Sequence, residues 1–200
     1  MTRTGMVSCF AMVLLTVVLA GWIMLEHGTG DIGTREALRG TARLAFIPFV
    51  LCFIARPLHD LHSNGVSAWL LANRKVLGVS FGLSITVHLW LILWLFYLSA
   101  PDIPEVVTLA DFAIGGPGLF LVAVMLVTTM ERPRAAIDPV WWNRIHTFGQ
   151  YLVWFIFLAC LTDSHGRKSP PYPASDYVPF IAILVAAMAV RLGAAWLGRR

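Results

Sequence analysis

The sequence predicts an all-α fold, an integral membrane bundle of about six transmembrane helices. Of its 200 residues, 58% are hydrophobic and only 13% are charged. The apolar residues form long uninterrupted blocks, and a helix needs about 20 such residues to cross the ~30 Å apolar core of a bilayer. Six blocks approach this length, which leaves little room for a separate soluble domain. We therefore expect a single transmembrane domain over residues 1–200.

The predicted spans, in chain order, cover residues 5–25, 40–58, 76–99, 112–130, 141–162 and 177–197. The first resembles a signal peptide in position, but its apolar run is long and VLAGW is a poor cleavage site, so a retained span is expected. The second has only twelve uncharged residues between Arg43 and Arg56, whose long side chains can both reach the membrane surfaces. Pro57 is expected to end this span, because proline lacks the backbone N–H that a helix interior uses.

The basic residues predict the orientation, because cytoplasmic loops are enriched in Lys and Arg. With the N-terminus inside, ten of the fifteen Lys and Arg lie at or near the cytoplasmic surface: Arg3, Arg56, Arg74, Lys75, Arg132, Arg134, Arg144, Arg191, Arg199 and Arg200. Both termini are therefore expected in the cytoplasm. The net charge of +4 is explained by this topology, and no nucleic-acid partner is expected.

The three cysteines predict neither a disulfide framework nor a zinc site. Cys9, Cys52 and Cys160 all lie in apolar segments and show no CxxC spacing. Thiols in such surroundings usually behave as small buried hydrophobes.

Two of the six histidines, His88 and His146, fall inside predicted spans, where an ionisable side chain indicates function by default. A neutral imidazole there can bind a metal, or it can join helices by a hydrogen bond, and the residues alone leave both interpretations open. Gly149 follows His146 by about one helical turn and would let a flat macrocycle approach the backbone, although glycine also serves helix packing. His59 and His62 are expected to be solvated or to face lipid headgroups.

Three segments carry a resemblance to a known family. They are GTARLAFIPFVLCFIARPLHDL, LLANRKVLGVSFGLSITVHL and WWNRIHTFGQYLVWFIF. They show a proline at the end of span two, a basic pair and Leu-Gly at the start of span three, and Trp-x-x-x-x-His at the start of span five. Over residues 40–197 the chain resembles the ferric reductase-like transmembrane domain, in particular the branch with the heme-binding membrane subunit of the methionine sulfoxide reductase system.

The resemblance implies a six-span protein of the cell inner membrane that holds heme b and passes electrons across the bilayer. It implies His88 and His146 as ligands of the heme iron. We expect no flavin or nicotinamide domain on this chain, so FAD or FMN would act only through a partner. The electron donor would be a separate flavin reductase or a quinol, and a periplasmic protein would be the acceptor.

The chain departs from the family pattern at Ala159, where a second histidine is expected in span five. His88 lies thirteen residues, or ~20 Å of helix rise, beyond Lys75, whereas His146 is two residues from Arg144. The two histidines therefore lie at different depths. Either the helices are offset, or each histidine has its own site, with His59 or His62 as the partner of His146, or heme binding has been lost.

Two rival interpretations follow from the residues. The first is a degenerate, non-heme membrane protein that acts as a structural or assembly partner and uses His88 only for packing. The second is a small transporter, which would need a pair of charged or polar residues near the middle of the membrane. The sequence offers no such pair apart from the histidines.

Overall fold

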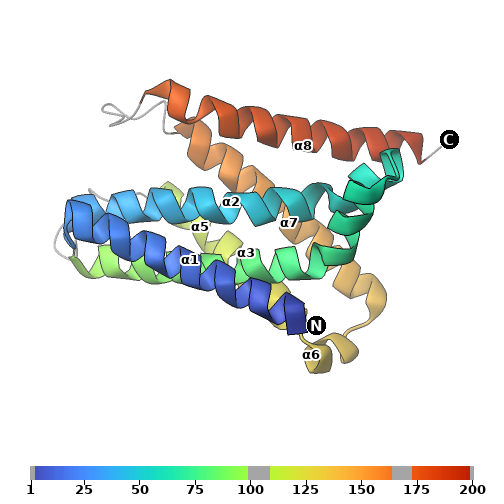
Figure 1. Ribbon diagram of the computed structural model, residues 1–200, viewed down its shortest axis with the longest axis horizontal. Coiled ribbons are helices and arrows are strands. Elements are labelled where there is room, and N and C mark those ends of the chain that lie inside the picture. The colour runs from blue at the N-terminus through green and yellow to red at the C-terminus, as the bar shows by residue number, and fades with distance from the viewer. Residues whose placement is uncertain (1–2, 99–108, 164–172, 199–200) are drawn as a thin grey trace.

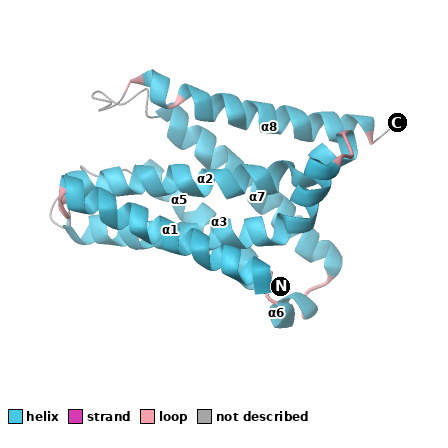
Figure 2. Cartoon of the chain, viewed as in Figure 1, coloured by secondary structure: helices cyan, strands magenta, loops and turns pink. Residues whose placement is uncertain are grey.

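The structure is a computed structural model that describes residues 3–98, 109–163 and 173–198. In these ranges the chain consists of helices joined by short connections, and it has no strand (Figure 2). Its elements are α1 (Arg3–His27), α2 (Asp31–Leu61), α3 (Gly65–Leu98), α5 (Leu109–Val127), α6 (Glu131–Ala135), α7 (Pro139–Asp163), η1 (Ala174–Asp176) and α8 (Val178–Leu197). The predicted all-α fold is confirmed.

Five helices in the described ranges are long and apolar enough to cross a membrane: α1, α2, α3, α7 and α8. A shorter apolar segment, Gly115–Val127, forms the later part of α5. The chain is therefore a multi-pass membrane protein. A sixth span through α5 stays a prediction, as does the assignment of both termini to the cytoplasm.

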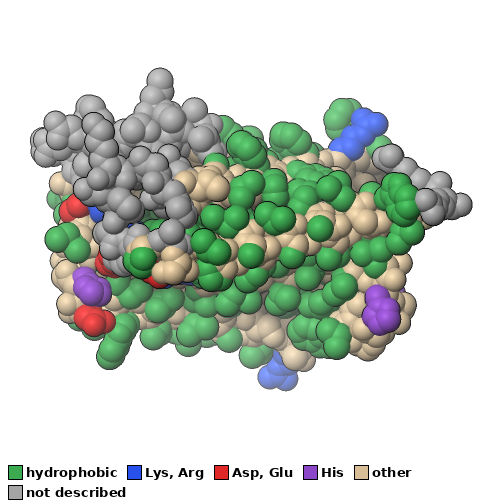
Figure 3. Space-filling model, turned by 90° about the horizontal axis from the view of Figure 1, so that it is seen from above, with side chains coloured by type: hydrophobic (Ala, Val, Ile, Leu, Met, Phe, Trp, Pro, Cys, Tyr) green, Lys and Arg blue, Asp and Glu red, His purple; other side chains and the backbone are tan. Residues whose placement is uncertain are grey.

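The surface of the protein is apolar while part of its interior is polar. Phe10, Trp90 and Phe120 are each about 70% exposed, whereas the side chains of Thr16 and Ser84 are fully buried. Hydrophobic side chains spread along the visible face in Figure 3, and acidic and histidine side chains show only toward its two ends. A soluble protein would bury these large apolar groups, so this distribution fits a lipid environment.

Helices α2 and α3 begin well before the spans predicted for them, at Asp31 and Gly65. The first turns of α2 are polar and are held by ion pairs, such as that between Arg35 and Asp31 at 2.9 Å. Hydropathy identifies only the part of a helix that lies in lipid, so it misses such extensions. Pro57, which is expected to end the second span, lies inside α2, and the helix continues four residues beyond it to Leu61.

Helix α2 lies at the centre of the fold and packs against α1, α3 and α8, while α5 packs against α7 and α3. The main core cluster includes Phe46, Phe49 and Phe53 of α2, with Phe81 of α3 and Leu184 of α8. Helix α1 begins and α8 ends at the same end of the molecule (Figure 1). The packing of α2, α3, α5 and α7 leaves one space between these four helices near that end.

Candidate functional site

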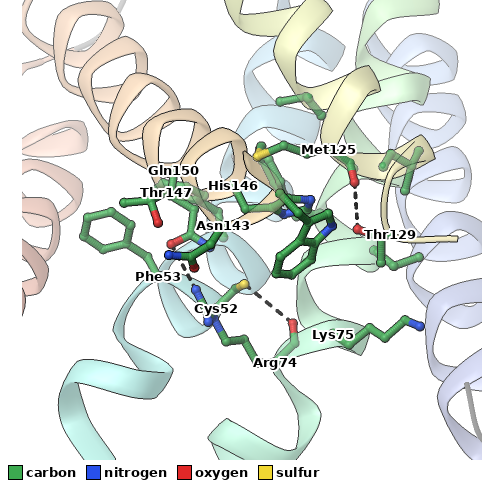
Figure 4. A pocket seen from close by; sticks show the side chains of 18 of the residues that line it. Cys52, Phe53, Arg74, Lys75, Met125, Thr129, Asn143, His146, Thr147 and Gln150 are labelled. Atoms are coloured by element: carbon green, nitrogen blue, oxygen red, sulfur yellow. Dashed lines mark hydrogen bonds between the residues drawn. The ribbon is translucent and has the colours of Figure 1, made fainter. Parts of the chain in front are cut away.

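A cavity of about 380 Å³ lies between α2, α3, α5 and α7 (Figure 4). Its apolar wall includes Phe49, Phe53, Phe81 and Val122, and its polar wall includes Arg74, Arg134, Asn143, His146 and Gln150. The volume lies within the range of ~300–1,000 Å³ that is usual for small-molecule and cofactor sites.

His146 lines this cavity from α7 and is held in place by groups on two sides. Its Nε2 lies 3.1 Å from the hydroxyl of Thr128, which follows α5. The indole of Trp142 stacks on the imidazole with ring centroids 4.1 Å apart, and its Nε1 donates to the carbonyl of Thr128 at 2.9 Å. The guanidinium of Arg134 lies 4.7 Å from the Trp142 ring centroid. The imidazole therefore has a fixed position between α5 and α7.

Gly149 is buried but is not one of the residues that line the cavity. A Cβ added at Gly149 would collide with the thioether sulfur of Met125. Met125, from α5, itself lines the cavity, as does the thiol-bearing Cys52 of α2. The glycine thus allows close packing of α5 on α7, the second of the two roles that the sequence allowed.

His88 lies outside this cavity. It is half-buried on α3, and its Nδ1 is 2.9 Å from the hydroxyl of Thr41 on α2. The α3 residues that line the cavity end at Gly82, and His88 follows six residues later, about 9 Å of helix rise further along. The structure therefore does not bring His88 and His146 to one cavity.

His59 and His62 also lie outside the cavity. The Nδ1 of His59 is 3.1 Å from the hydroxyl of Ser67, at the start of α3. His62 is exposed, and its carbonyl accepts a hydrogen bond from the same hydroxyl at 2.8 Å. Among the described residues, no group of three or more His, Cys, Asp and Glu side chains is placed to hold a metal ion.

Two arginines from different helices meet at one amide on the polar side of the cavity. Arg74 of α3 donates to Oε1 of Gln150 at 3.3 Å, and Arg191 of α8 donates to the same oxygen at 2.9 Å. Figure 4 shows Arg74 and Gln150 pointing toward one another, with Lys75 extended away from them. The guanidinium of Arg191 also lies 4.4 Å from the Phe53 ring centroid and 4.5 Å from that of Tyr151. We call Arg74, Gln150 and Arg191 the guanidinium pair and its amide.

Pro57 explains why Arg191 comes to this position. A proline in a helix leaves the carbonyl four residues earlier without its usual N–H donor. That carbonyl belongs to Phe53, and it accepts a hydrogen bond from Nη1 of Arg191 at 3.2 Å. The donor that Pro57 removes from α2 is thus replaced by a side chain of α8.

These polar groups were not predicted from the sequence as a site. The arginines were interpreted only as indicators of topology, and a pair of polar residues inside the spans was not expected. The pattern did contain an indication, since Arg191 interrupts an otherwise apolar run of α8 and Gln150 is the last polar residue before the apolar part of α7. A polar residue within a span usually faces the bundle interior and often marks function.

Comparisons with protein-family models, curated proteins and solved structures found no match to this chain. The resemblance to the ferric reductase-like domain therefore stays a prediction. The cavity itself offers an imidazole, two sulfur-bearing side chains, an aromatic wall and a cationic wall. Such a set can bind a flat, largely apolar molecule and can ligate a soft or borderline metal carried by it.

Proposed function

We propose that the chain is a heme b-containing electron-transfer subunit of the inner membrane, with six spans and both termini in the cytoplasm. It would receive electrons from a separate flavin reductase or a quinol and pass them to a periplasmic acceptor. The resemblance to the ferric reductase-like transmembrane domain motivates this proposal. The single observation that supports it is the position of His146, whose imidazole lines a cavity between four helices.

The residues around His146 have the chemistry that heme requires. An imidazole is a common ligand of heme iron, and thioether ligation beside histidine is another established choice, which makes Met125 the candidate second ligand. Phe49, Phe53 and Phe81 would cover the faces of the macrocycle and exclude water. The stacked Trp142 and the Thr128 hydroxyl would hold the imidazole in orientation. Heme, when bound, supplies an iron that alternates between ferrous and ferric states and so carries one electron.

A reduced-minus-oxidised difference spectrum of the purified protein tests this proposal. We expect b-type absorbance from the wild type and its loss in His146→Ala. His62→Ala is the matched control, because His62 is exposed and outside the cavity, and it should keep the full spectrum. Wild-type protein without b-type absorbance, or a His146→Ala variant that keeps it, would contradict the proposal.

A second candidate function is that of a non-heme structural or assembly partner. The observation that favours it is that each of the two histidines already has a hydrogen-bonding threonine on or next to a neighbouring helix, Thr41 for His88 and Thr128 for His146. Such pairs join helices within lipid without any cofactor. The difference spectrum separates the candidates, because a non-heme partner should show no b-type absorbance, whereas the heme-containing subunit should show it and lose it in His146→Ala.

A further inference from the structure

The guanidinium pair and its amide form an electrostatically incomplete site. Arg74 and Arg191 both donate to the one oxygen of Gln150, so two positive charges lie within two hydrogen-bond lengths of each other. The amide oxygen carries only a partial negative charge, and it cannot neutralise two guanidinium groups. Like charges at this separation repel one another, and the repulsion is strong where the surroundings are apolar.

The described residues supply no acid to balance this charge. No Asp or Glu lines the cavity, whereas Arg74, Lys75 and Arg134 all do. The ion pairs found in the described ranges join other arginines, Arg35, Arg39, Arg43 and Arg56, to carboxylates elsewhere on the surface. In the described chain the arginines at the cavity are thus set apart from those that have carboxylate partners.

Both arginines are only partly exposed, and they are directed toward groups inside the bundle. Arg191 lies six residues, or about 9 Å of helix rise, before the end of α8, and it faces the aromatic rings of Phe53 and Tyr151. Arg74 faces into the cavity toward Gln150 (Figure 4). Cations that point into a bundle instead of toward the bulk solvent are costly, and they usually pair with another charge.

We propose that this wall of the cavity is a binding site for an oxyanion of the phosphate class. Arg74 and Arg191 would bind it from two sides, Gln150 would keep their spacing, and Arg134 would add a third cation. Planar guanidinium groups match the geometry of phosphate oxygens, because two parallel N–H groups can donate to two oxygens. Basic pockets between transmembrane helices are recognised positions for acidic lipid headgroups, and free phosphate offers the same chemistry. This proposal goes beyond electron transfer and does not depend on bound heme.

The test measures the thermal unfolding of the purified protein in a non-ionic detergent. The probes are inorganic phosphate, mixed micelles with phosphatidylglycerol, and mixed micelles with phosphatidylcholine as the neutral control. We expect an anion-dependent rise in Tm, and a ligand at one hundred times its Kd would stabilise the fold by about 2.7 kcal/mol, a 100-fold change in the folding equilibrium. A rise with phosphatidylglycerol alone indicates a lipid headgroup, and a rise with phosphate alone indicates a soluble anion.

Two variants and one control make the test decisive. Arg191→Met should lose most of the anion-dependent rise, while Arg144→Gln, which removes an exposed arginine of α7 outside the cavity, should keep it. Gln150→Glu places a carboxylate between the two arginines, so it should raise Tm without any anion and abolish the response to added anion. This variant keeps the test informative if Arg191→Met fails to fold. The heme spectrum of each variant is recorded in parallel, so loss of heme and loss of anion binding are read separately. An equal response of wild type and Gln150→Glu to anions, or no wild-type response to either anion, would overturn the proposal.

Discussion

The packing of α7 on α5 leads to a prediction about Gly149. A Gly149→Ala change adds a methyl group where the sulfur of Met125 lies, so either Met125 or the helix must move. Overpacking of this kind costs about 1–3 kcal/mol. Alanine also favours the helix over glycine by up to about 1 kcal/mol. We therefore expect Gly149→Ala to be destabilised by about 1 kcal/mol overall.

The matched control is Gly21→Ala on α1, where an added Cβ meets nothing within 4 Å. That variant should gain the helix-propensity term alone, so the difference between the two variants isolates the packing cost. The assay is equilibrium unfolding in mixtures of SDS and a non-ionic detergent, followed by tryptophan fluorescence. In a Met125→Ala background, Gly149→Ala should become as favourable as Gly21→Ala. Equal unfolding midpoints of Gly149→Ala and Gly21→Ala in the wild-type background would refute the reasoning.

Three further changes have expected outcomes in the same unfolding assay. Thr41→Val removes the hydroxyl that bonds His88 and should destabilise the protein by about 1 kcal/mol, whereas Thr162→Val, at an exposed hydroxyl of α7, should have little effect. Gly28→Ala should cost about 1–2 kcal/mol, because Gly28 directly follows α1 and has a φ of 86°, a left-handed conformation that alanine adopts poorly. Arg191→Met should cost less in a Pro57→Ala background than in the wild type, since alanine at position 57 restores an N–H donor for the Phe53 carbonyl. If the effects of Arg191→Met and Pro57→Ala on stability were strictly additive, the Phe53 carbonyl would not couple the two residues.

The sequence was sufficient for the helices but not for their full lengths. Long apolar blocks are a direct requirement of a ~30 Å hydrocarbon layer, so helical segments within spans are easily recognised. The polar first turns of α2, from Asp31, are stabilised by ion pairs between neighbouring turns, and hydropathy does not report these. The continuation of the helix through Pro57 was not predicted, because the effect of a proline depends on whether another group can replace the missing donor. Here that group is Arg191, far away in the sequence.

The candidate site was predicted only in part for a related reason. His146 could be singled out because an imidazole in an apolar run is conspicuous, and it does line the cavity. The difference in position between His88 and His146 along the helices could also be inferred from their spacing to basic residues. The meeting of Arg74 and Arg191 at Gln150 depends on how three helices pack, and a single sequence contains no measure of that packing.

The contact between Arg191 and the Phe53 carbonyl has a consequence for assembly during synthesis. Membrane helices are inserted in order, so α2 enters the bilayer long before α8 is made. Until then the Phe53 carbonyl has no donor from Arg191, and a bare peptide carbonyl is costly in hydrocarbon. The second helix is therefore left incomplete by its own proline, and α8, which is translated much later, closes the gap. Ribosome-bound chains that end before α8 should accordingly be cleaved more readily by protease at the later turns of α2 than longer chains in which α8 has left the ribosome.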